Sequence, residues 1–587
     1  LTGGDRGPVP HAAWLALAHL DDERVDPHFR EVENLDREAS VAWQYGLGLR
    51  DTIDPASARR VGRYLEQTDY APARRAAAWV LRRHGGEGIL PLMRDRISHD
   101  MDPAVVSEAI LALGDAHQPE DERLLGDIYM DVHQSRDVAV LKELHQKHRF
   151  PIGGRGLHGI NTDHGFPIVG IRNAAALALA HYDVDPDQES PALRSLTRPF
   201  RRFEGELPDV GIPHENLRGG PPIRVTNGNL AVTPGPYPFL DRAWFDVSGN
   251  LRVEGAAEKR FGLIALGKVG FEEEADLLVD VLRRKYIPDV LSKPKHRIDP
   301  NRAFAVYALG HYIRRAGERF EREGKPHRAE RARRRNGRYV ETLRRVVQDT
   351  NEPESLRSAA VVALGLSQDP GAANAIREAA ASFRSNTLML GYAALALGLL
   401  GDRDALPVAR RALKIESREG AAARIDAQML TARGVRHSLP LKALLTARAA
   451  CDGVGLVGQT DADAAFLERM VGDNYFVSQS AVLALRRMGA GEPTLRAMID
   501  VLENDPPIPL AALAAWSIGV LLDPDPDPRM LSLTQGHNFT LPNERHFVDE
   551  IAPNHFQRIA KEDPGLRYRA YAQPFFNRML LPGARLR

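Results

Sequence analysis

The stretch 356-LRSAAVVALGLSQDPGAANAIREAAASF-383 has two short apolar stripes separated by a break. In each half, Ala, Val, Leu, Ile or Phe recurs every three or four residues, which is typical of one face of a helix. Asp369-Pro370-Gly371 is a turn signal, and we expect Gly365 to leave the first helix because glycine has no Cβ. Neither helix can bury its stripe alone, so the stretch predicts one unit of a repeated two-helix array.

Copies of one tripeptide mark this unit elsewhere in the chain. Five of the ten gaps between successive copies are 30–34 residues, another is 66, or twice 33, and larger gaps mark insertions or extra units. This period with two helices per unit is the signature of an α-solenoid. The sequence therefore predicts an all-α fold, a right-handed α-solenoid of roughly a dozen two-helix repeats. Ala-Leu-Gly stands at 112–114, 265–267, 308–310, 363–365 and 396–398, with looser versions at 16–18, 46–48, 80–82, 178–180, 484–486 and 517–519.

The repeat resembles the HEAT-like repeat family, in particular the short repeats named after phycobilin lyases. The resemblance implies a superhelical stack of helix pairs over most of the chain, apart from the long insertions. It leaves function open, because the family includes scaffolds, lyases and DNA-repair enzymes. The matching residues are Arg357, Ala359-Ala360, Ala363-Leu364-Gly365, Asp369-Pro370 and Ala375-Ile376, and the pattern recurs over 392–413 and 259–282.

Interruptions of the repeat divide the chain into four predicted segments. Prolines prevent helices from running through the second of them, and Asn227-Gly228 and Ser248-Gly249-Asn250 predict two β-hairpins there. The segments are 1–184, N-terminal repeats with a Gly- and His-rich loop at 150–170; 185–255, a Pro-rich β-containing insertion; 256–522, further repeats with a charged helical extension at 314–338; and 523–587, a C-terminal cap or arm.

Bulk composition narrows the function classes. Lys+Arg and Asp+Glu are both 78, and a net charge of +0 argues against coating nucleic acid or an anionic membrane with the whole surface. The single cysteine, Cys451, excludes an intramolecular disulfide and Cys-based zinc, iron–sulfur and haem-attachment motifs. No 18-residue stretch is apolar enough to span a membrane. A chain that starts at Leu1 rather than Met, with one cysteine, favours an exported or periplasmic bacterial protein over a cytoplasmic one.

Two patterns were weighed as cofactor or metal sites. Glycines 453, 455 and 458 have dinucleotide-binding spacing, but an Ala-rich helix precedes them where a strand is needed, so we expect a flexible link. The densest histidine cluster could hold zinc or a similar ion, or could be a polar loop in a chain with 20 histidines. Catalytic residues, cofactors and metal sites are therefore not assigned; the weak metal candidates are His145, His148, His158 and His164.

Partner binding is assigned to aromatic residues of the Pro-rich insertion and to the basic run of the charged extension. Residues 314–338 contain 11 Lys or Arg and 4 Glu. Aromatic and arginine side chains are favoured at interfaces, although a small local core and a solvated helix with internal ion pairs explain the same patterns. The assigned residues are Phe200, Phe203, Trp244, Phe245, Arg333, Arg334 and Arg335.

These patterns favour a non-enzymatic scaffold or adaptor, a subunit of a larger assembly that binds protein partners through the solenoid surface and its insertions. Two alternatives stay open. One is a cofactor-handling or lyase-like HEAT-repeat enzyme, which a chromophore or stoichiometric metal would reveal. The other is a nucleic-acid binder that uses the basic segment 314–338, which salt-dependent binding would reveal.

Overall fold

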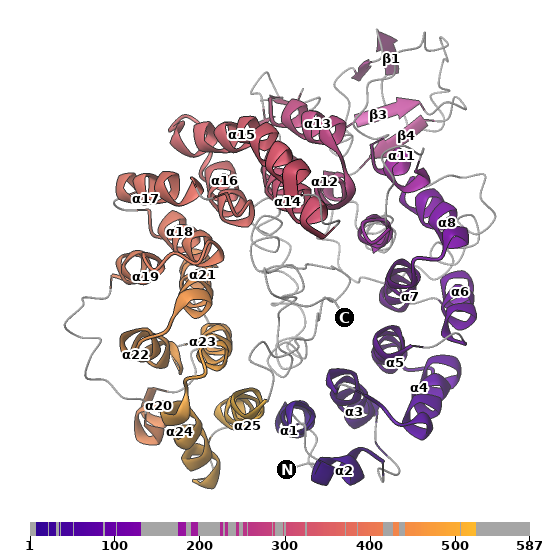
Figure 1. Cartoon of the computed structure of the whole chain (residues 1–587). Helices are drawn as coiled ribbons and strands as arrows, with labels where there is room; N and C mark the ends of the chain where they lie inside the picture. The colour runs from indigo at the N-terminus through magenta and orange to yellow at the C-terminus, as the bar shows by residue number, and fades with distance from the viewer. Residues whose placement is uncertain are drawn as a thin grey trace. The chain divides into compact units, whose positions relative to one another are not determined.

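Helices account for most of the residues described by the computed structural model (Figure 1). The predicted all-α class is confirmed at this level. No helix among these residues is long and apolar enough to cross a membrane. The described residues are 8–20, 23–30, 35, 37–50, 52–85, 88–100, 103–130, 174–182, 190–197, 223–226, 229–232, 242–245, 251–254, 256–283, 286–287, 297–298, 301–322, 326–369, 371–383, 386–414, 426–433, 441–472, 474–504, 506 and 508–523.

The chain forms two compact units: unit 1 comprises Leu1–Ile89 with Gly317–Arg587, and unit 2 comprises Leu90–Ala316. In unit 1, eight helices pack side by side in one row, here called the core row. In packing order they are α16 (Glu354–Leu366), α18 (Thr387–Leu399), α21 (Leu441–Val457), α23 (Tyr475–Arg487), α25 (Ile508–Leu522), α1 (Pro8–His19), α3 (Arg37–Leu49) and α5 (Ala71–His84).

A second set of helices, the flanking row, packs along the core row of unit 1. Smaller elements complete this unit. The flanking row consists of α17 (Ala372–Ser382), α19 (Ala405–Leu413), α22 (Asp461–Met470), α24 (Glu492–Glu503) and α4 (Pro55–Gln67). The other helices are η1 (Glu23–Val25), α2 (Asp26–Arg30), α15 (Pro326–Gln348) and α20 (Ala427–Arg433).

The repeated Ala-Leu-Gly motif makes the contact between successive core-row helices. A Cβ placed on Gly365 of α16 would lie 2.6 Å from Cα of Ala396 in α18. The glycine that ends one copy therefore packs on the alanine that opens the next, and only two such small residues let the backbones approach this closely. The same pairing joins Gly455 to Ala484 in unit 1, and Gly114 to Ala178 and Gly267 to Ala308 in unit 2.

The first and last described helices of the chain meet through this same motif. A Cβ on Gly519 of α25 would lie 2.3 Å from Cα of Ala16 in α1, so α1 follows α25 as one repeat follows another. Beside this contact, His19 Nδ1 lies 2.6 Å from Asp523 Oδ2, and both side chains are largely buried. The core row of unit 1 is therefore continuous across residues that are about 500 positions apart in sequence.

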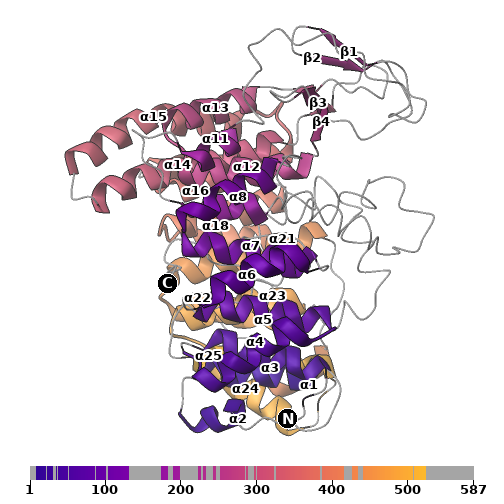
Figure 2. The same cartoon turned by 90° about the vertical axis from the view of Figure 1, so that its right-hand side faces the viewer.

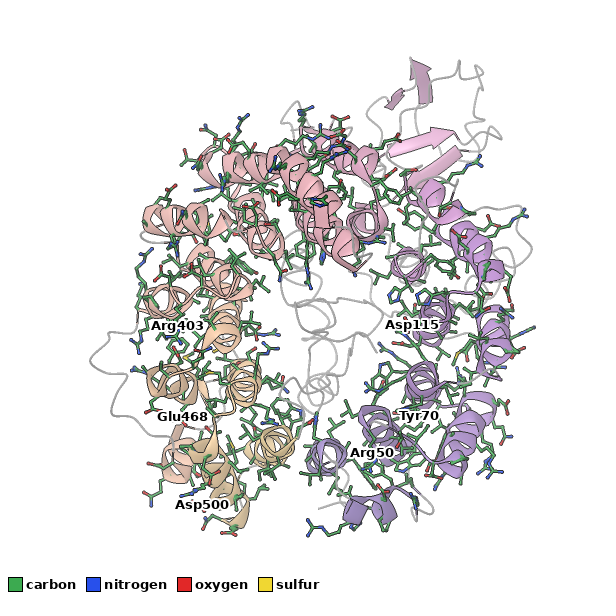
Figure 3. All side chains as sticks on the ribbon, in the orientation of Figure 1. Arg50, Tyr70, Asp115, Arg403, Glu468 and Asp500 are labelled. Atoms are coloured by element: carbon green, nitrogen blue, oxygen red, sulfur yellow. The ribbon has the colours of Figure 1, made fainter. Side chains whose placement is uncertain are left out.

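Burial differs sharply between the two rows, whose side chains are drawn in Figure 3. In α17 of the flanking row, the buried positions are Ala372, Ile376, Ala379 and Ala380, which form one face of an amphipathic helix. In α18 of the core row, all twelve residues from Leu388 to Leu399 are buried. A helix that is apolar and buried all round has neighbours on every side.

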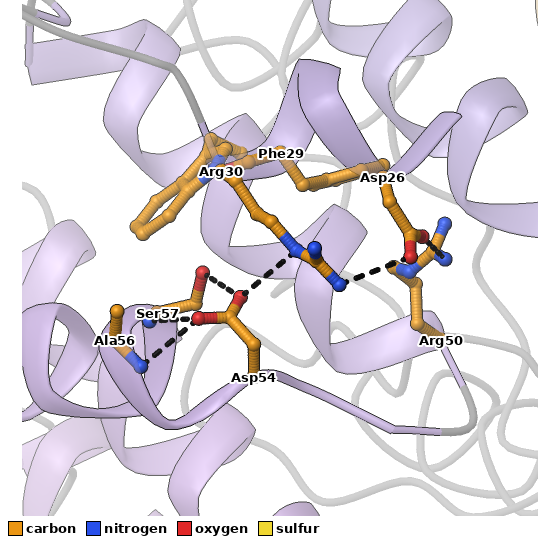
Figure 4. Close-up of polar contacts among 8 residues, drawn as sticks. Asp26, Phe29, Arg30, Arg50, Asp54, Ala56 and Ser57 are labelled. Carbon is orange, nitrogen blue, oxygen red and sulfur yellow. Dashed lines mark hydrogen bonds and ion pairs between the residues drawn. The ribbon is translucent and has the colours of Figure 1, made fainter. Parts of the chain in front are cut away.

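The turn between α3 and α4 shows how side chains fix one helix start (Figure 4). Asp54 caps α4 by accepting hydrogen bonds from the backbone of Ala56 at 2.9 Å and of Ser57 at 3.1 Å. Burial alone would raise the pKa of Asp54, but the hydrogen bonds from Ser57 and Ala56, with the nearby charge of Arg30, outweigh it and lower the pKa. This arrangement stabilises the first turn of a helix that supports the core row.

Unit 2 contains helices and three short antiparallel strand pairs. Arg94 binds Asp121 through two hydrogen bonds of 2.8 and 2.9 Å, a bidentate pair that links α6 to α8. The helices are α6 (Ile89–His99, whose first residue belongs to unit 1), α7 (Pro103–Ala116), α8 (Pro119–Met130), a segment at 174–179, α11 (Pro191–Thr197), α12 (Ala256–Val269), α13 (Glu272–Arg283) and α14 (Asn301–Arg322, which crosses the unit boundary).

The strand pairs of unit 2 lie in the Pro-rich segment and just beyond it. Each pair is antiparallel, and Figure 2 shows the first two side by side at the edge of this unit. The pairs are β1 (Ile223–Thr226) with β2 (Asn229–Val232), β3 (Arg242–Phe245) with β4 (Leu251–Glu254), and β5 (Tyr286–Ile287) with β6 (Arg297–Ile298).

Two expectations about glycines were wrong for the same reason. Gly365 stays inside α16, which ends at Leu366, and the left-handed residue that ends the turn is Gln368 with φ of 52°. The three-glycine stretch is no flexible link, because α21 runs through Gly453 and Gly455 to Val457. In each case the glycine serves close contact with a neighbouring helix rather than a change of backbone direction.

Candidate interaction surfaces

The predicted site residues are spread over both units. The weak metal candidates His145, His148, His158 and His164 lie outside the described residues, as do Phe200 and Phe203. Within the described residues, no group of three or more His, Cys, Asp or Glu side chains could hold a metal ion. Trp244 and Phe245 lie on β3 of unit 2, opposite Arg252 and Leu251 of β4. The structure describes their backbone but not their side chains.

The predicted basic run lies on α15 of unit 1, which begins at Pro326. Its second half is anchored, because Tyr339, Leu343 and Val347 are buried and the helix packs on α16 and α17. The 23 residues of α15 contain eight arginines and two glutamates. Since the anchored face is apolar, these charges gather on the remaining surface of the helix.

Exposed arginines on α15 define the first surface, here called the arginine face: Arg331, Arg334, Arg335, Arg338 and Arg345. Arg334 pairs with Glu330 at 3.1 Å and Arg345 pairs with Glu341 at 3.1 Å, each one turn apart. Such exposed pairs contribute only about 0.3–0.5 kcal/mol, so they leave Arg334 and Arg345 available to a partner. The side chain of Arg333, on the same helix, is outside the described part.

Helical geometry defines a second surface on the core row. In α18, Ala396 faces α16 and Gly398 faces α21. Successive residues of a helix are 100° apart, so Leu395 and Leu397 point to the two other, opposite sides of α18. The residue after the alanine faces the flanking row. Its equivalent in α23 is Leu485, whose Cβ lies 3.4 Å from a Cβ built on Gly491 at the start of α24. The residue before the alanine therefore faces away from the flanking row.

This second surface is called the free face of the core row. Each of the eight helices contributes to it the residue that precedes the alanine position of the motif. Each of them is at most 7% exposed. Two neighbours on it, Tyr45 and Trp79, stack edge to face with ring centroids 5.6 Å apart. In packing order from α16 to α5, the residues are Val362, Leu395, Asp452, Leu483, Trp516, Leu15, Tyr45 and Trp79.

Sequence analysis missed the free face, although the signal was present. Each of its residues immediately precedes the first residue of an Ala-Leu-Gly copy or of a looser version at the same register. Counting one residue back from each motif copy finds seven of them once the motif is known to face the neighbouring helices, and Asp452 precedes Gly453-Val454-Gly455, which has the same register. Three of the eight are aromatic, whereas aromatics are 6% of the chain. This enrichment favours a surface that contacts a further polypeptide segment.

Comparison of the chain with protein-family models and with curated proteins gave no match. The resemblance to HEAT-like repeats therefore rests on the residues of the repeat itself.

Proposed function

We propose that the protein is a non-enzymatic scaffold, a right-handed α-solenoid of HEAT-like repeats with a β-containing insertion, that binds an acidic protein segment through the arginine face of α15. The observation that carries this proposal is the charge of α15, where eight arginines stand against two glutamates on one exposed, anchored helix. The protein as a whole has no net charge, so this concentration is a local feature.

The kind of partner follows from the guanidinium group. Arginine presents a planar set of donors that matches a carboxylate, and its weak hydration lowers the cost of bringing it to an interface. The arginines also stand on a helix whose second half is fixed by Tyr339, Leu343 and Val347, so their spacing is set before binding. A preformed basic surface loses less entropy on association than a free basic tail.

Native purification of the protein from the cells that produce it tests the proposal. We expect one or more polypeptides to co-purify in fixed ratio and to dissociate as salt is raised, because screening weakens exposed charge pairs. The variant R331E/R334E/R335E should lose the partner, with affinity falling by at least about tenfold. Recovery of a free monomer only, at low salt, would refute the scaffold proposal.

A matched control separates the arginine face from overall charge. The variant R59E/R283E/R496E changes the net charge equally, on α4, α13 and α24. Arg283 and Arg496 also have exposed carboxylate partners one turn away, at 3.5 and 2.9 Å, as Arg334 does. It should keep the partner with unchanged affinity. Equal loss in both variants would mean that net charge, rather than α15, is responsible.

Nucleic acid is a second candidate partner, favoured by the same excess of arginine on α15. The two candidates differ in the salt dependence of binding. For duplex DNA, the logarithm of affinity falls linearly with the logarithm of salt, with a slope of about −0.9 for each phosphate contacted. Binding of a labelled random duplex to the protein, lost in R331E/R334E/R335E and kept in the control, would replace the protein partner with nucleic acid.

A further inference from the structure

The free face of the core row is buried, although the helices known to pack on the row lie beside it or behind it. In α18, twelve consecutive residues from Leu388 to Leu399 are buried, and at 100° per residue they cover the whole circumference. Its main neighbours within the described residues are α16 and α21 at its sides and α17 and α19 on the flanking side. The remaining side is the free face, so another element covers it.

A buried polar group on the free face indicates what kind of element this is. Trp516 is 1% exposed, and its indole N–H has no hydrogen-bond partner among the described residues. Leaving such a donor buried and unpaired is unfavourable, because the group loses its hydrogen bond to water. An occupant that suits this face supplies hydrogen-bond acceptors among apolar groups, as a polypeptide does.

We propose that the free face of unit 1 is covered by the chain's own C-terminal segment, residues 524–587. This segment leaves α25 directly after Asp523, which is bound to His19 of α1 at the middle of the core row. Its 64 residues can extend about 200 Å at roughly 3.3 Å each. The row from α25 to its end at α16 is about 40 Å long, from four helix spacings of 8–10 Å. The segment is long enough to follow the whole face.

The composition of the segment matches the face. It contains five phenylalanines, two tyrosines and nine lysines or arginines, against seven acidic residues. Its aromatics can fill the spaces between Trp516, Tyr45 and Trp79, and its backbone carbonyl groups can accept a hydrogen bond from the indole N–H of Trp516. Tethering also raises its local concentration to the millimolar range, which favours it over a second molecule of protein at micromolar concentration.

Site-specific photo-crosslinking in the full-length chain tests this proposal. The photoreactive amino acid p-benzoylphenylalanine is placed at Trp516 or Tyr45 on the free face, and at Ile499 or Arg403 on exposed positions of the flanking side as controls. A mixture of isotope-labelled and unlabelled protein at micromolar concentration is irradiated and digested for mass spectrometry. We expect the two free-face positions, but neither control, to crosslink to peptides of 524–587.

The labelling identifies the source of the crosslinked peptide. Capture of the chain's own segment gives products within one isotope class, exceeding mixed products on the order of a thousandfold because of tethering. Mixed products would show that a second copy of the chain covers the free face. Crosslinks to residues 90–316 or to a co-purified protein would show that one of these covers it. Each of these results overturns the proposal. Amide hydrogen exchange of the unsubstituted chain covers the case in which both variants misfold. The proposal requires at least tenfold slower exchange in part of 524–587 than in an unstructured peptide, and free-chain exchange throughout would refute it.

Discussion

Replacing Gly519 by alanine tests whether α1 stacks on α25 as the next repeat. The new Cβ would lie 2.3 Å from Cα, 2.7 Å from the carbonyl oxygen and 2.8 Å from Cβ of Ala16. These atoms are backbone or nearly so, and they cannot move unless the two helices separate. Overpacking of this kind costs about 1–3 kcal/mol. The higher helix propensity of alanine returns at most about 1 kcal/mol, so we expect a net loss of about 1–2 kcal/mol.

The same substitution at other glycines supplies the controls. Gly365→Ala, at an ordinary junction between α16 and α18, should be destabilising to a similar extent, because its Cβ would lie 2.6 Å from Cα of Ala396. Gly62 in α4 and Gly337 in α15 have open space where a Cβ would go. Gly62→Ala and Gly337→Ala should therefore stabilise the protein by about 0.5–1 kcal/mol.

Urea unfolding followed by tryptophan fluorescence measures these effects. Four of the five tryptophans lie on α1, α3, α5 and α25, so the signal reports the region around Gly519. For a urea slope of about 3 kcal/mol per molar, the expected loss lowers the midpoint by about 0.5 M. A Gly519→Ala midpoint equal to or above that of the wild type, with Gly365→Ala lowered, would refute the stacking of α1 on α25.

Two other predictions concern titratable groups. Asp54→Ala should destabilise unit 1 by about 1 kcal/mol at pH 7 in urea unfolding, because it removes the cap of α4. Since the folded-state pKa of Asp54 is lowered, this difference in stability from the wild type should shrink as pH falls through that pKa. A difference that stays constant with pH would contradict the assignment of Asp54 as the cap. Burial, with Lys268 and Arg314 nearby, lowers the pKa of His311 well below 6.5, so the unfolded state binds the proton more readily. The wild type should lose up to about 1.4 kcal/mol per pH unit below pH 6.5 relative to His311→Gln, as measured by circular dichroism in urea, and parallel curves would contradict this.

Helix periodicity predicted the repeat, but the sequence did not show which neighbour each motif residue contacts. The pattern over 356–383 gave two helices, and the structure has α16 and α17 there. The error about Gly365 arose because a glycine near a turn usually relieves backbone strain, whereas this one accommodates Ala396, a residue 31 positions away. Close contacts between repeats are non-local, so periodicity alone does not identify them.

The arginine face could be predicted from the sequence more directly than the free face. The basic run was visible because charge is a local property of the sequence, and the exposed arginines 334 and 335 lie on α15 as a result. The free face could not be assigned from the motif alone, because Trp516 and Tyr45 are distant in sequence and lie on the same surface only after α25 stacks on α1. Burial of an aromatic residue also looks the same in sequence whether it faces a core or a partner.

The repeat motif also explains why the free face is the surface on which the repeats differ from one another. At four junctions of the core row, α16–α18, α18–α21, α21–α23 and α25–α1, the glycine and alanine positions are restricted to small residues by the distance between successive helices. The residue before the alanine meets no such restriction, and it is Val362 in α16, Asp452 in α21 and Trp516 in α25. The array can therefore change what it binds on this face one repeat at a time without changing how its helices stack. An occupant of the free face is selected by the order of these residues. Substitutions there should alter which segment is bound while leaving the helix-to-helix contacts intact, except at Trp79, whose ring packs on Gly48 of α3.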